Sequence, residues 1–452
     1  MKAEIRFHQP PMFSGLALRR LLIPLLLEQT LTVLIGMADT VMVASCGEAS
    51  VSGVSLVDSI NVLLIMVFSA LATGGAVVTS QYLGKKDVRE ASASARQLFY
   101  AVLMASLAIM FVCLALRDVI LSGLFGSIER DVMEAARVYF LLSALSYPFL
   151  AMYNASAALL RSQGNAKASL YTSMVMNIVN VAGNAITIYG FGMGVMGAGL
   201  ATLFSRMIGA AVIQKALGNP DCTLPRPGLL HFEWRPDLIV KIFRVGIPNG
   251  LENGLFQFGK LALLRMISTF GTVSITANAV GNTLGTFHCL PGNAIGLAMI
   301  TVVGQCVGAK QFDQARYYTR RLMLINYAIQ GTLNILILLA NSFILKPFHL
   351  TAETELLARQ IIAIHGSGSI LLWPLAFTLP NALRAAGDAR FTMTVSIASM
   401  LSFRIVFGYL LAIPAGLGVI GVWLAMQIDW VARITCFITR FRGRRWESKA
   451  LV

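Results

Sequence analysis

The chain contains one pattern twice, at a nearly constant shift. Four segments of the first half return in the second half: 20–28 (RLLIPLLLE, returning at 244–252 as RVGIPNGLE), 81–84 (QYLG, at 305–308 as QCVG), 160–167 (LRSQGNAK, at 383–390 as LRAAGDAR) and 194–201 (GVMGAGLA, at 418–425 as GVIGVWLA). The shift is 224 residues in three cases and 223 in the third. Such constancy indicates one duplicated unit, and in an apolar chain two such units predict pseudo-symmetric halves around a pathway.

The composition excludes a water-soluble globule. Hydrophobic residues make up 56% of the 452 residues and charged residues only 13%, whereas soluble domains have about 25% charged residues. Apolar runs of about 20 residues are long enough to cross the hydrocarbon core as helices. We therefore predict an all-α, polytopic membrane protein. Its twelve spans are predicted at about 15–44, 52–83, 96–116, 132–160, 168–190, 196–217, 238–269, 274–307, 317–345, 356–384, 391–413 and 417–439.

The placement of the basic residues predicts the orientation. With a cytoplasmic N-terminus, 26 of the 36 Lys and Arg residues fall in inner segments, five in outer segments and five within spans. The positive-inside rule therefore places both termini in the cytoplasm, and nucleic acid is not needed to explain the net charge of +15. The first apolar run is longer than a cleavable signal peptide. We expect a multi-pass protein of the cytoplasmic (inner) membrane of a prokaryote.

A Pro-rich, polar break divides the chain near its middle. We predict an N-terminal six-helix lobe at 1–217, a cytoplasmic linker at 218–236 and a C-terminal six-helix lobe at 237–452. An even number of spans returns the chain to its starting side, so the lobes are predicted to be parallel and related by an axis along the membrane normal.

No residue pattern indicates an enzyme. The six cysteines and five histidines show no metal-ligand spacing and no nucleophile–histidine pair, and we expect no cofactor. Small buried side chains explain the cysteines.

Asp39 is the foremost candidate for chemistry, because it lies deep in the first span without a basic residue in that helix to neutralise it. A charge inside the hydrocarbon is costly, so such a group is a functional candidate by default. It suits a site that takes up and releases a proton or a monovalent cation. An aspartate capped by neighbouring hydroxyls, or facing a solvated vestibule, is the structural alternative.

Span five presents three carboxamides on one face. Asn177, Asn180 and Asn184 follow each other at spacings of three and four residues. Such a face is too polar for lipid and must contact other helices or a cavity, with hydrogen bonding between helices as the alternative. Thr202 in span six supplies a further oxygen, and a hard cation such as sodium prefers oxygen ligands.

Glu28 and Glu252 occupy equivalent positions, each four residues after its proline, Pro24 or Pro248. Each proline removes a backbone donor and favours a bend, and the shared position raises both above ordinary packing kinks. For Glu252, an ion pair with Lys260 or Arg265 in the same span is the structural alternative. Asp429 and Arg433, four residues apart in span twelve, are predicted to form an internal ion pair.

Over essentially its whole length the chain resembles the multidrug and toxic compound extrusion (MATE) family of secondary antiporters. The motifs that carry the resemblance are Ile-Pro24 followed by Asp39, the Gln-x-x-Gly pairs at 81 and 305, the Leu-Arg-x-x-Gly pairs at 160 and 383, Asn180-x-x-x-Asn184, and Gly-Val-x-Gly-x-x-x-Ala in spans six and twelve. Each motif is weak alone. Their order, repeated in both halves, is specific.

The resemblance implies a V-shaped fold of two six-helix bundles that exports cationic or amphipathic drugs by alternating access against proton or sodium influx. Asp39, Asn180, Asn184 and Thr202 fall on the cation-coupling positions, and are the tentative sodium ligands. Many relatives have Asp at Asn184, which leaves the coupling ion open. Glu252, Glu28 and Asn177 are secondary candidates. Relatives with an acidic residue near Glu252 carry a second carboxylate in span ten, where this chain has Trp373 nearby.

Two alternatives from other classes were weighed. A flippase of lipid-linked saccharides or other lipids would need a central cavity lined by several cations, and few Arg or Lys lie within spans. An intramembrane enzyme would need a catalytic pair at matched depth, which the sequence lacks. The expected partners are membrane lipid and small cationic or amphipathic substrates, with the protein acting as a monomer.

Overall fold

A computed structural model describes residues 10–126, 128–220, 222–224 and 233–452. Lys2, Arg6, Arg226, His8, His231 and part of the predicted linker at 218–236 lie outside the described residues. Within them the chain forms helices and no strands, as predicted. The α-helices are α1 (Gly15–Ala44), α2 (Glu48–Gly84), α3 (Val88–Ala115), α4 (Arg117–Phe125), α5 (Arg130–Ser162), α6 (Ala166–Asn184), α7 (Gly194–Leu217), α8 (Pro236–Ser268), α9 (Thr272–Gly308), α10 (Phe312–Leu339), α11 (Asn341–Leu345), α12 (Ala352–Leu371), α13 (Pro380–Ala385), α14 (Ala389–Ser399), α15 (Val406–Ala412) and α16 (Gly418–Arg442).

Three predicted spans contain a π-helical segment. These segments are η1 (Ala185–Gly190) after α6, η3 (Pro374–Thr378) between α12 and α13, and η4 (Met400–Ile405) between α14 and α15. Two single turns of 3-10 helix, η2 (Lys346–Phe348) and η5 (Glu447–Lys449), complete the helical elements. Sequence periodicity does not report an i→i+5 turn, and such turns often lie at functional sites.

Nine helices of the described chain are long and apolar enough to cross a membrane, and ten if the pair α12 with η3–α13, bent by 60°, is one span. The predicted count of twelve is therefore not reached by this criterion. The 19-residue α6 falls short of it until the η1 turn is added. Helix α8 also falls short, and it carries six charged residues.

The chain forms two compact units. One comprises Arg19–Gly250, and the other comprises Met1–Leu18 with Leu251–Val452. Helices α1 and α8 each contribute residues to both units. The lobe and linker boundaries predicted from sequence remain predictions.

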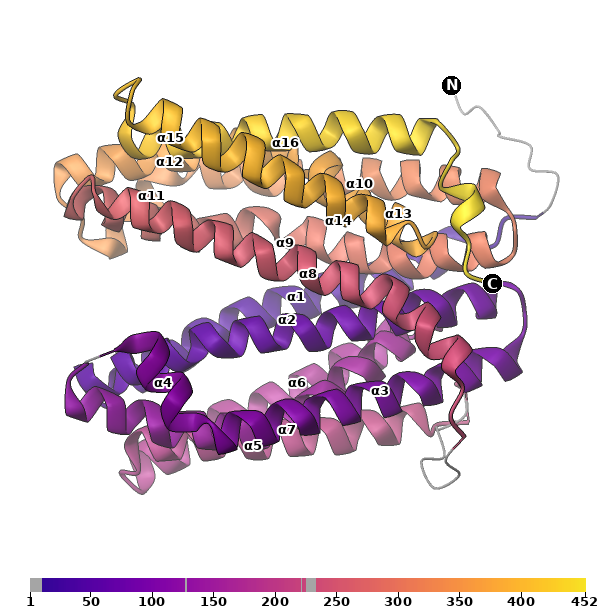
Figure 1. The fold of residues 1–452 in the computed structure, drawn as a ribbon, viewed down its shortest axis with the longest axis horizontal. Helices are drawn as coiled ribbons and strands as arrows, with labels where there is room; N and C mark the ends of the chain where they lie inside the picture. Colours follow the sequence, from indigo (N-terminus) through magenta and orange to yellow (C-terminus); the bar gives the residue numbers. More distant parts are fainter. Residues whose placement is uncertain (1–9, 127, 221, 225–232) are drawn as a thin grey trace. The chain divides into compact units, whose positions relative to one another are not determined.

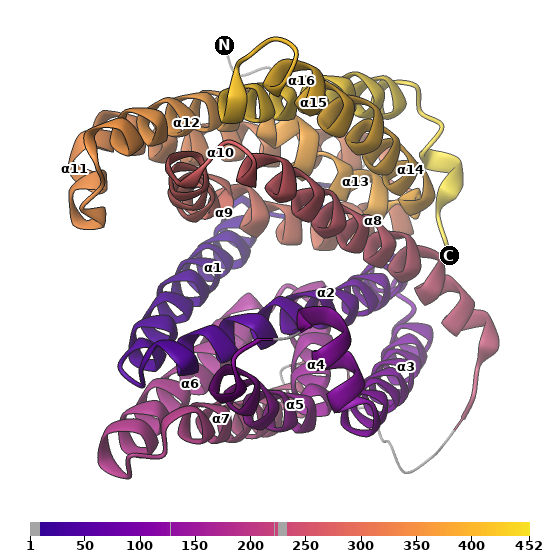
Figure 2. The same cartoon turned by 60° about the vertical axis from the view of Figure 1, so that its left-hand side comes forward.

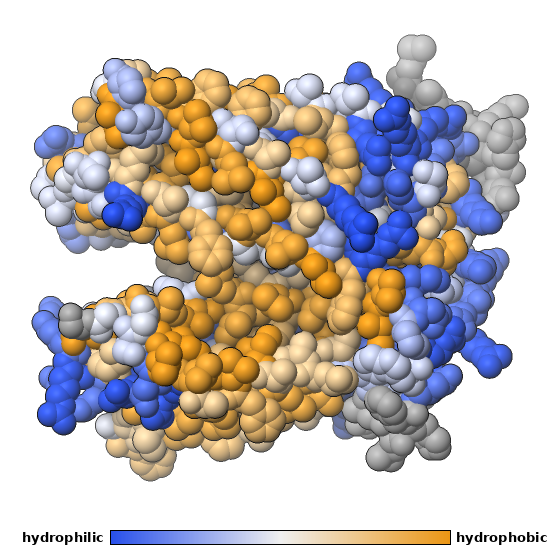
Figure 3. Space-filling view, in the orientation of Figure 1, coloured by the Kyte–Doolittle hydropathy of each residue, from blue (hydrophilic) through white to orange (hydrophobic). Residues whose placement is uncertain are grey.

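In the unit Arg19–Gly250, α5 packs against α2, α3 and α7, and α6 packs against α7 (Figures 1 and 2). In the unit that contains Leu251–Val452, α9 is the central helix and packs against α10, α12 and α13. Helix α16 covers η4 and α15 in the same unit. Apolar side chains cover the middle of the visible face of each unit, and hydrophilic side chains gather toward the helix ends (Figure 3). This distribution is the one expected of helices that cross a bilayer.

The repeated glycines explain why the motifs recur. A Cβ on Gly197 would lie 2.9 Å from the Thr187 side chain, and one on Gly421 would lie 2.6 Å from the Leu411 backbone. In each unit the glycine therefore allows a close approach between consecutive spans. Gly164 and Gly387 have φ of 83° and 92°, the left-handed region that favours glycine, and they end the Leu-Arg-x-x-Gly turns.

Candidate functional site

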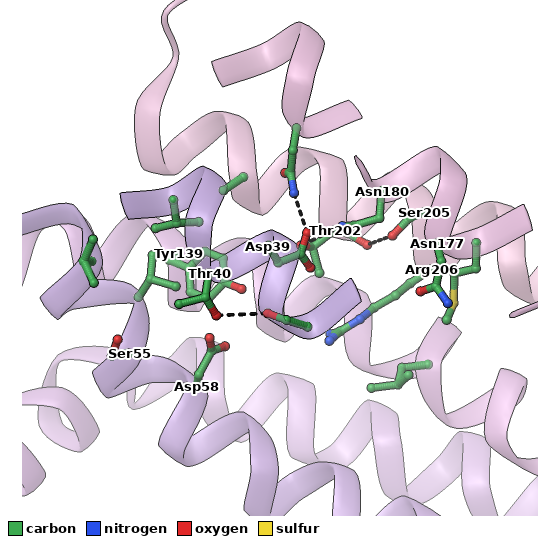
Figure 4. Close-up of a pocket in the computed structure, with 18 residues that line it drawn as sticks. Asp39, Thr40, Ser55, Asp58, Tyr139, Asn177, Asn180, Thr202, Ser205 and Arg206 are labelled. Atoms are coloured by element: carbon green, nitrogen blue, oxygen red, sulfur yellow. Dashed lines mark hydrogen bonds between the residues drawn. The ribbon is translucent and has the colours of Figure 1, made fainter. Parts of the chain in front are cut away.

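A cavity of about 280 Å³ lies inside the unit Arg19–Gly250 (Figure 4). Polar side chains from five helices line it. They are Asp39 and Thr40 from α1, Ser55 and Asp58 from α2, Tyr139 from α5, Asn177, Asn180 and Asn184 from α6, and Thr202, Ser205 and Arg206 from α7. The four coupling positions predicted from sequence, and Asn177, are thus brought together in one cavity.

Asp39 is half-buried and accepts a hydrogen bond from Asn184, with Nδ2 2.8 Å from Oδ1. Asn184 is 2% exposed and is the last residue of α6, where the backbone passes into the π-helical η1. Its own carbonyl oxygen, Oδ1, is buried and has no hydrogen-bond partner among the described residues. An unpaired buried oxygen costs free energy unless a donor or a cation binds it.

Asn180 is the second carboxamide on Asp39. With its nitrogen turned toward the carboxylate, Nδ2 lies 2.6 Å from Oδ1 and 2.9 Å from Oδ2 of Asp39. The other terminal atom of this carboxamide then lies 3.4 Å from the Thr202 hydroxyl. In the opposite orientation two acceptors would face each other. Asn180, Asn184 and Asp39 thus form one hydrogen-bonded cluster, and Thr202 borders it.

Asn177 lines the same cavity but does not hydrogen-bond to Asp39. Its Nδ2 donates to Ser173 Oγ at 3.3 Å. The shared helical face was predicted correctly from the spacing, but only its two deeper carboxamides contact the carboxylate.

The cavity also contains charged groups that the sequence did not assign to it. Asp58 interacts electrostatically with Asp39, and Arg206 interacts with both carboxylates. Tyr139 interacts with Asp58 and Thr202. Two carboxylates and one guanidinium give the site a formal charge of −1 when both acids are ionised. The rule that singled out Asp39, that charges within spans are functional candidates, also applies to Asp58 and Arg206.

A hydrogen-bond network fixes these additional groups. The Arg206 guanidinium donates to Ser146 Oγ at 2.6 Å. On the α2 side, Asn61 donates to Asp58 Oδ1 at 3.0 Å and accepts from the Tyr147 hydroxyl at 2.8 Å. Asp58 and Arg206 are therefore oriented by α5, the central helix of this unit.

Glu28 and Glu252 do not lie in this cavity. The Glu28 carboxylate binds Arg161, with Nη1 3.4 Å from Oε1, and accepts from Ser169 Oγ at 2.9 Å. Glu252 binds Arg384, with Nη2 2.7 Å from Oε1, and accepts from Ser396 Oγ at 2.7 Å. The Leu-Arg-x-x-Gly motifs supply both arginines.

The partner predicted for Glu252 was therefore wrong: it is Arg384, 132 residues away, and not Lys260 or Arg265. The internal pair of Asp429 and Arg433 is confirmed, with Nε 2.9 Å from Oδ1. Pro24 and Pro248 lie inside α1 and α8, as predicted, and their proposed role in bending is untested.

Comparison with known proteins gives consistent matches. The MatE family model matches residues 24–186 and 248–410, and the two matches begin 224 residues apart, which is the shift of the internal repeat. An uncharacterized transporter, YisQ of Bacillus subtilis strain 168, is 29% identical over 439 residues, covering 95% of this chain and 94% of YisQ. A probable multidrug resistance protein, NorM of Thermotoga maritima, is 25% identical over 443 residues, covering 96% and 93%. A crystal structure of MATE in the bent conformation has a TM-score of 0.87 at 21% identity, over 95% of this chain and 94% of that one.

Proposed function

Since the chain belongs to the MatE family of multi-pass membrane transporters, we propose that it exports cationic or amphipathic compounds by alternating access, driven by an inward flow of protons or sodium ions. The printed names of relatives, among them the probable multidrug resistance protein NorM, support this substrate class. The observation that carries the coupling proposal is the cluster of Asp39, Asn180 and Asn184 in a cavity with a formal charge of −1.

In this proposal Asp39 is the group whose charge changes. The ionised carboxylate accepts hydrogen bonds from Asn184 and from the nitrogen of Asn180. A protonated Asp39 would donate to the oxygen of Asn180 once that carboxamide turns by 180°. Proton binding therefore brings the cavity charge to zero and exchanges hydrogen-bond partners without removing any. A transport cycle needs such a group, whose interactions differ between two states.

The same residues also suit sodium. Asp39, the unpaired oxygen of Asn184, and the oxygens of Asn180 and Thr202 form a set of hard ligands. A monovalent cation would neutralise the formal charge of −1 as a proton does. Either ion gains about 2.3 kcal/mol per 100 mV of membrane potential, which supports a roughly 50-fold gradient of a neutral substrate.

Proteoliposomes that contain a fluorescent lipophilic cation test this proposal, with a pH gradient and a sodium gradient imposed separately. We expect Asp39→Asn to insert and fold but to lose gradient-driven export. Asp118→Asn is the matched control, because the same chemical change is made at a side chain that is 58% exposed and lies outside the cavity. Unchanged export by Asp39→Asn at equal protein amount would refute the coupling role.

The same preparation separates the flippase alternative. A flippase would move a lipid-linked reporter from one leaflet to the other and would not deplete the dye. We further propose a monomer in the cytoplasmic membrane with both termini inside, because of the 26-to-5 distribution of basic residues.

A further inference from the structure

A second cavity lies in the unit that contains Leu251–Val452, well apart in sequence from the Asp39 cluster. It has a volume of about 590 Å³ and is formed by α10, α16 and the η3–α13 segment. Its size is that of a typical small-molecule pocket, about 300–1,000 Å³. We call it the α10–α16 groove.

The interior of the groove is mainly apolar. Six apolar side chains line it: Met323, Leu324, Leu375, Leu379, Ile438 and Phe441. Leu324 is 69% exposed, whereas Leu379 at the base is 4% exposed. Thr319 and Tyr327 are the uncharged polar side chains of the lining, and the Tyr327 hydroxyl already donates to Leu371 O at 3.1 Å. From Arg316 to Tyr327 the wall runs about 16 Å along α10, at 1.5 Å per residue.

Four arginines gather in the lining, around the start of α10 and the end of α16: Arg316, Arg320, Arg442 and Arg444. Two carboxylates neutralise part of this charge. Asp313 lies 3.7 Å from both Arg316 and Arg444, and Glu447 pairs with the same two arginines.

Arg320 and Arg442 remain without a counter-ion. Both are exposed, and neither forms a salt bridge with any described carboxylate. Arg316 lies within electrostatic reach of both Arg320 and Arg444, so like charges are concentrated at this end of the groove. Four guanidinium groups against two carboxylates leave a formal charge of +2. A bound anion would relieve this repulsion, and the planar guanidinium matches phosphate geometry.

A soluble anion would satisfy the arginines but would leave the apolar wall in water. An amphiphile with a negative headgroup satisfies both parts, and the membrane surrounding this chain supplies such molecules. Zwitterionic lipids bring no net charge to oppose +2. The positive-inside prediction puts these arginines on the cytoplasmic side, where anionic lipids attract basic residues.

We propose that the α10–α16 groove binds an anionic phospholipid. Its phosphate binds Arg320 and Arg442, and the first part of its acyl chains lies along Met323, Leu324 and Ile438. The lipid then joins α10 to the end of α16. This inference does not depend on the transported substrate or the coupling ion.

Native mass spectrometry of the full-length protein tests the proposal, with phosphatidylglycerol or phosphatidylcholine added after delipidation. The wild-type protein should retain one phosphatidylglycerol in preference to phosphatidylcholine. The double variant Arg320→Gln with Arg442→Gln should bind phosphatidylglycerol about 30-fold more weakly, at about 1 kcal/mol per arginine and 1.4 kcal/mol per tenfold change. The control is Arg390→Gln with Arg445→Gln, two exposed arginines that do not line the groove.

Equal weakening in both double variants would overturn the proposal, because it would indicate a general effect of surface charge. Leu324→Gln tests the apolar wall without changing the charge, and it should also weaken phosphatidylglycerol binding. Soluble glycerol phosphate should fail to displace the lipid. Displacement at similar concentrations would mean that the site recognises phosphate alone, and would refute the lipid assignment.

Discussion

Replacing Glu252 with glutamine tests whether this acid positions helices or couples an ion. Its carboxylate and Arg384 are buried, with side chains 10% and 12% exposed. Removing one partner of such a pair typically costs about 3–5 kcal/mol, because the other charge stays buried without compensation. Arg384 keeps a hydrogen bond from Nη1 to Asn381 Oδ1 at 2.8 Å, so we expect the lower end, about 3 kcal/mol.

The repeat supplies an internal comparison. The equivalent contact, Arg161 Nη1 to Glu28 Oε1, is 3.4 Å against 2.7 Å for Arg384 and Glu252. At an effective dielectric constant of about 20, these distances correspond to attractions of about 5 and about 6 kcal/mol before desolvation is subtracted. Glu28→Gln should therefore destabilise the protein by about 1 kcal/mol less than Glu252→Gln.

Thermal unfolding in detergent measures both effects. At about 2–4 °C per kcal/mol for a unit of this size, Glu252→Gln should lower the melting temperature by about 6–12 °C. Combining it with Arg384→Gln should cost about 2 kcal/mol less than the sum of the single changes. Gradient-driven export per folded molecule should persist. A Glu252→Gln variant that melts normally but no longer exports would refute the positioning role and make Glu252 a coupling residue.

The remaining predictions concern the coupling site, the helix bends and the packing of repeated spans. Asn184→Asp adds a negative charge to the cluster and should strengthen sodium dependence of export; indifference to sodium in both forms would leave only the proton version. Pro24→Ala should slow turnover while substrate affinity is kept, and Pro248→Ala should do less, because Asp39 follows only the first proline in its helix; equal losses of affinity would indicate packing roles. Gly421→Ala places a Cβ 2.6 Å from the Leu411 backbone and should cost about 1–3 kcal/mol; an unchanged melting temperature would show that the spans can separate.

The sequence predicted best what depends on one helix at a time. Periodicity placed Asn180 and Asn184 on one face, and the insertion cost of a charge identified Asp39. Partners from other helices could not be predicted, because a single sequence does not specify which faces meet. Arg384, the partner of Glu252, was missed for this reason, although its motif had been recognised in both halves.

The additional cavity residues were missed for a related reason. Asp58, Tyr139 and Arg206 come from α2, α5 and α7, and each also has an ordinary structural explanation when read alone. The π-helical turn after Asn184 was likewise invisible to a 3.6-residue period.

The residues just before α1 also constrain the order of events during synthesis. Met12 N donates to Gln314 Oε1 at 2.8 Å, and Phe13 N donates to the Tyr318 hydroxyl at 3.0 Å. These partners are translated 302 and 305 residues later. At about 5–20 residues per second, the start of the chain waits roughly 15–60 s for them. Insertion of α1 into the bilayer must therefore precede the docking of the residues in front of it. A nascent chain stalled before α10 would expose this segment to proteases, whereas the finished protein would protect it.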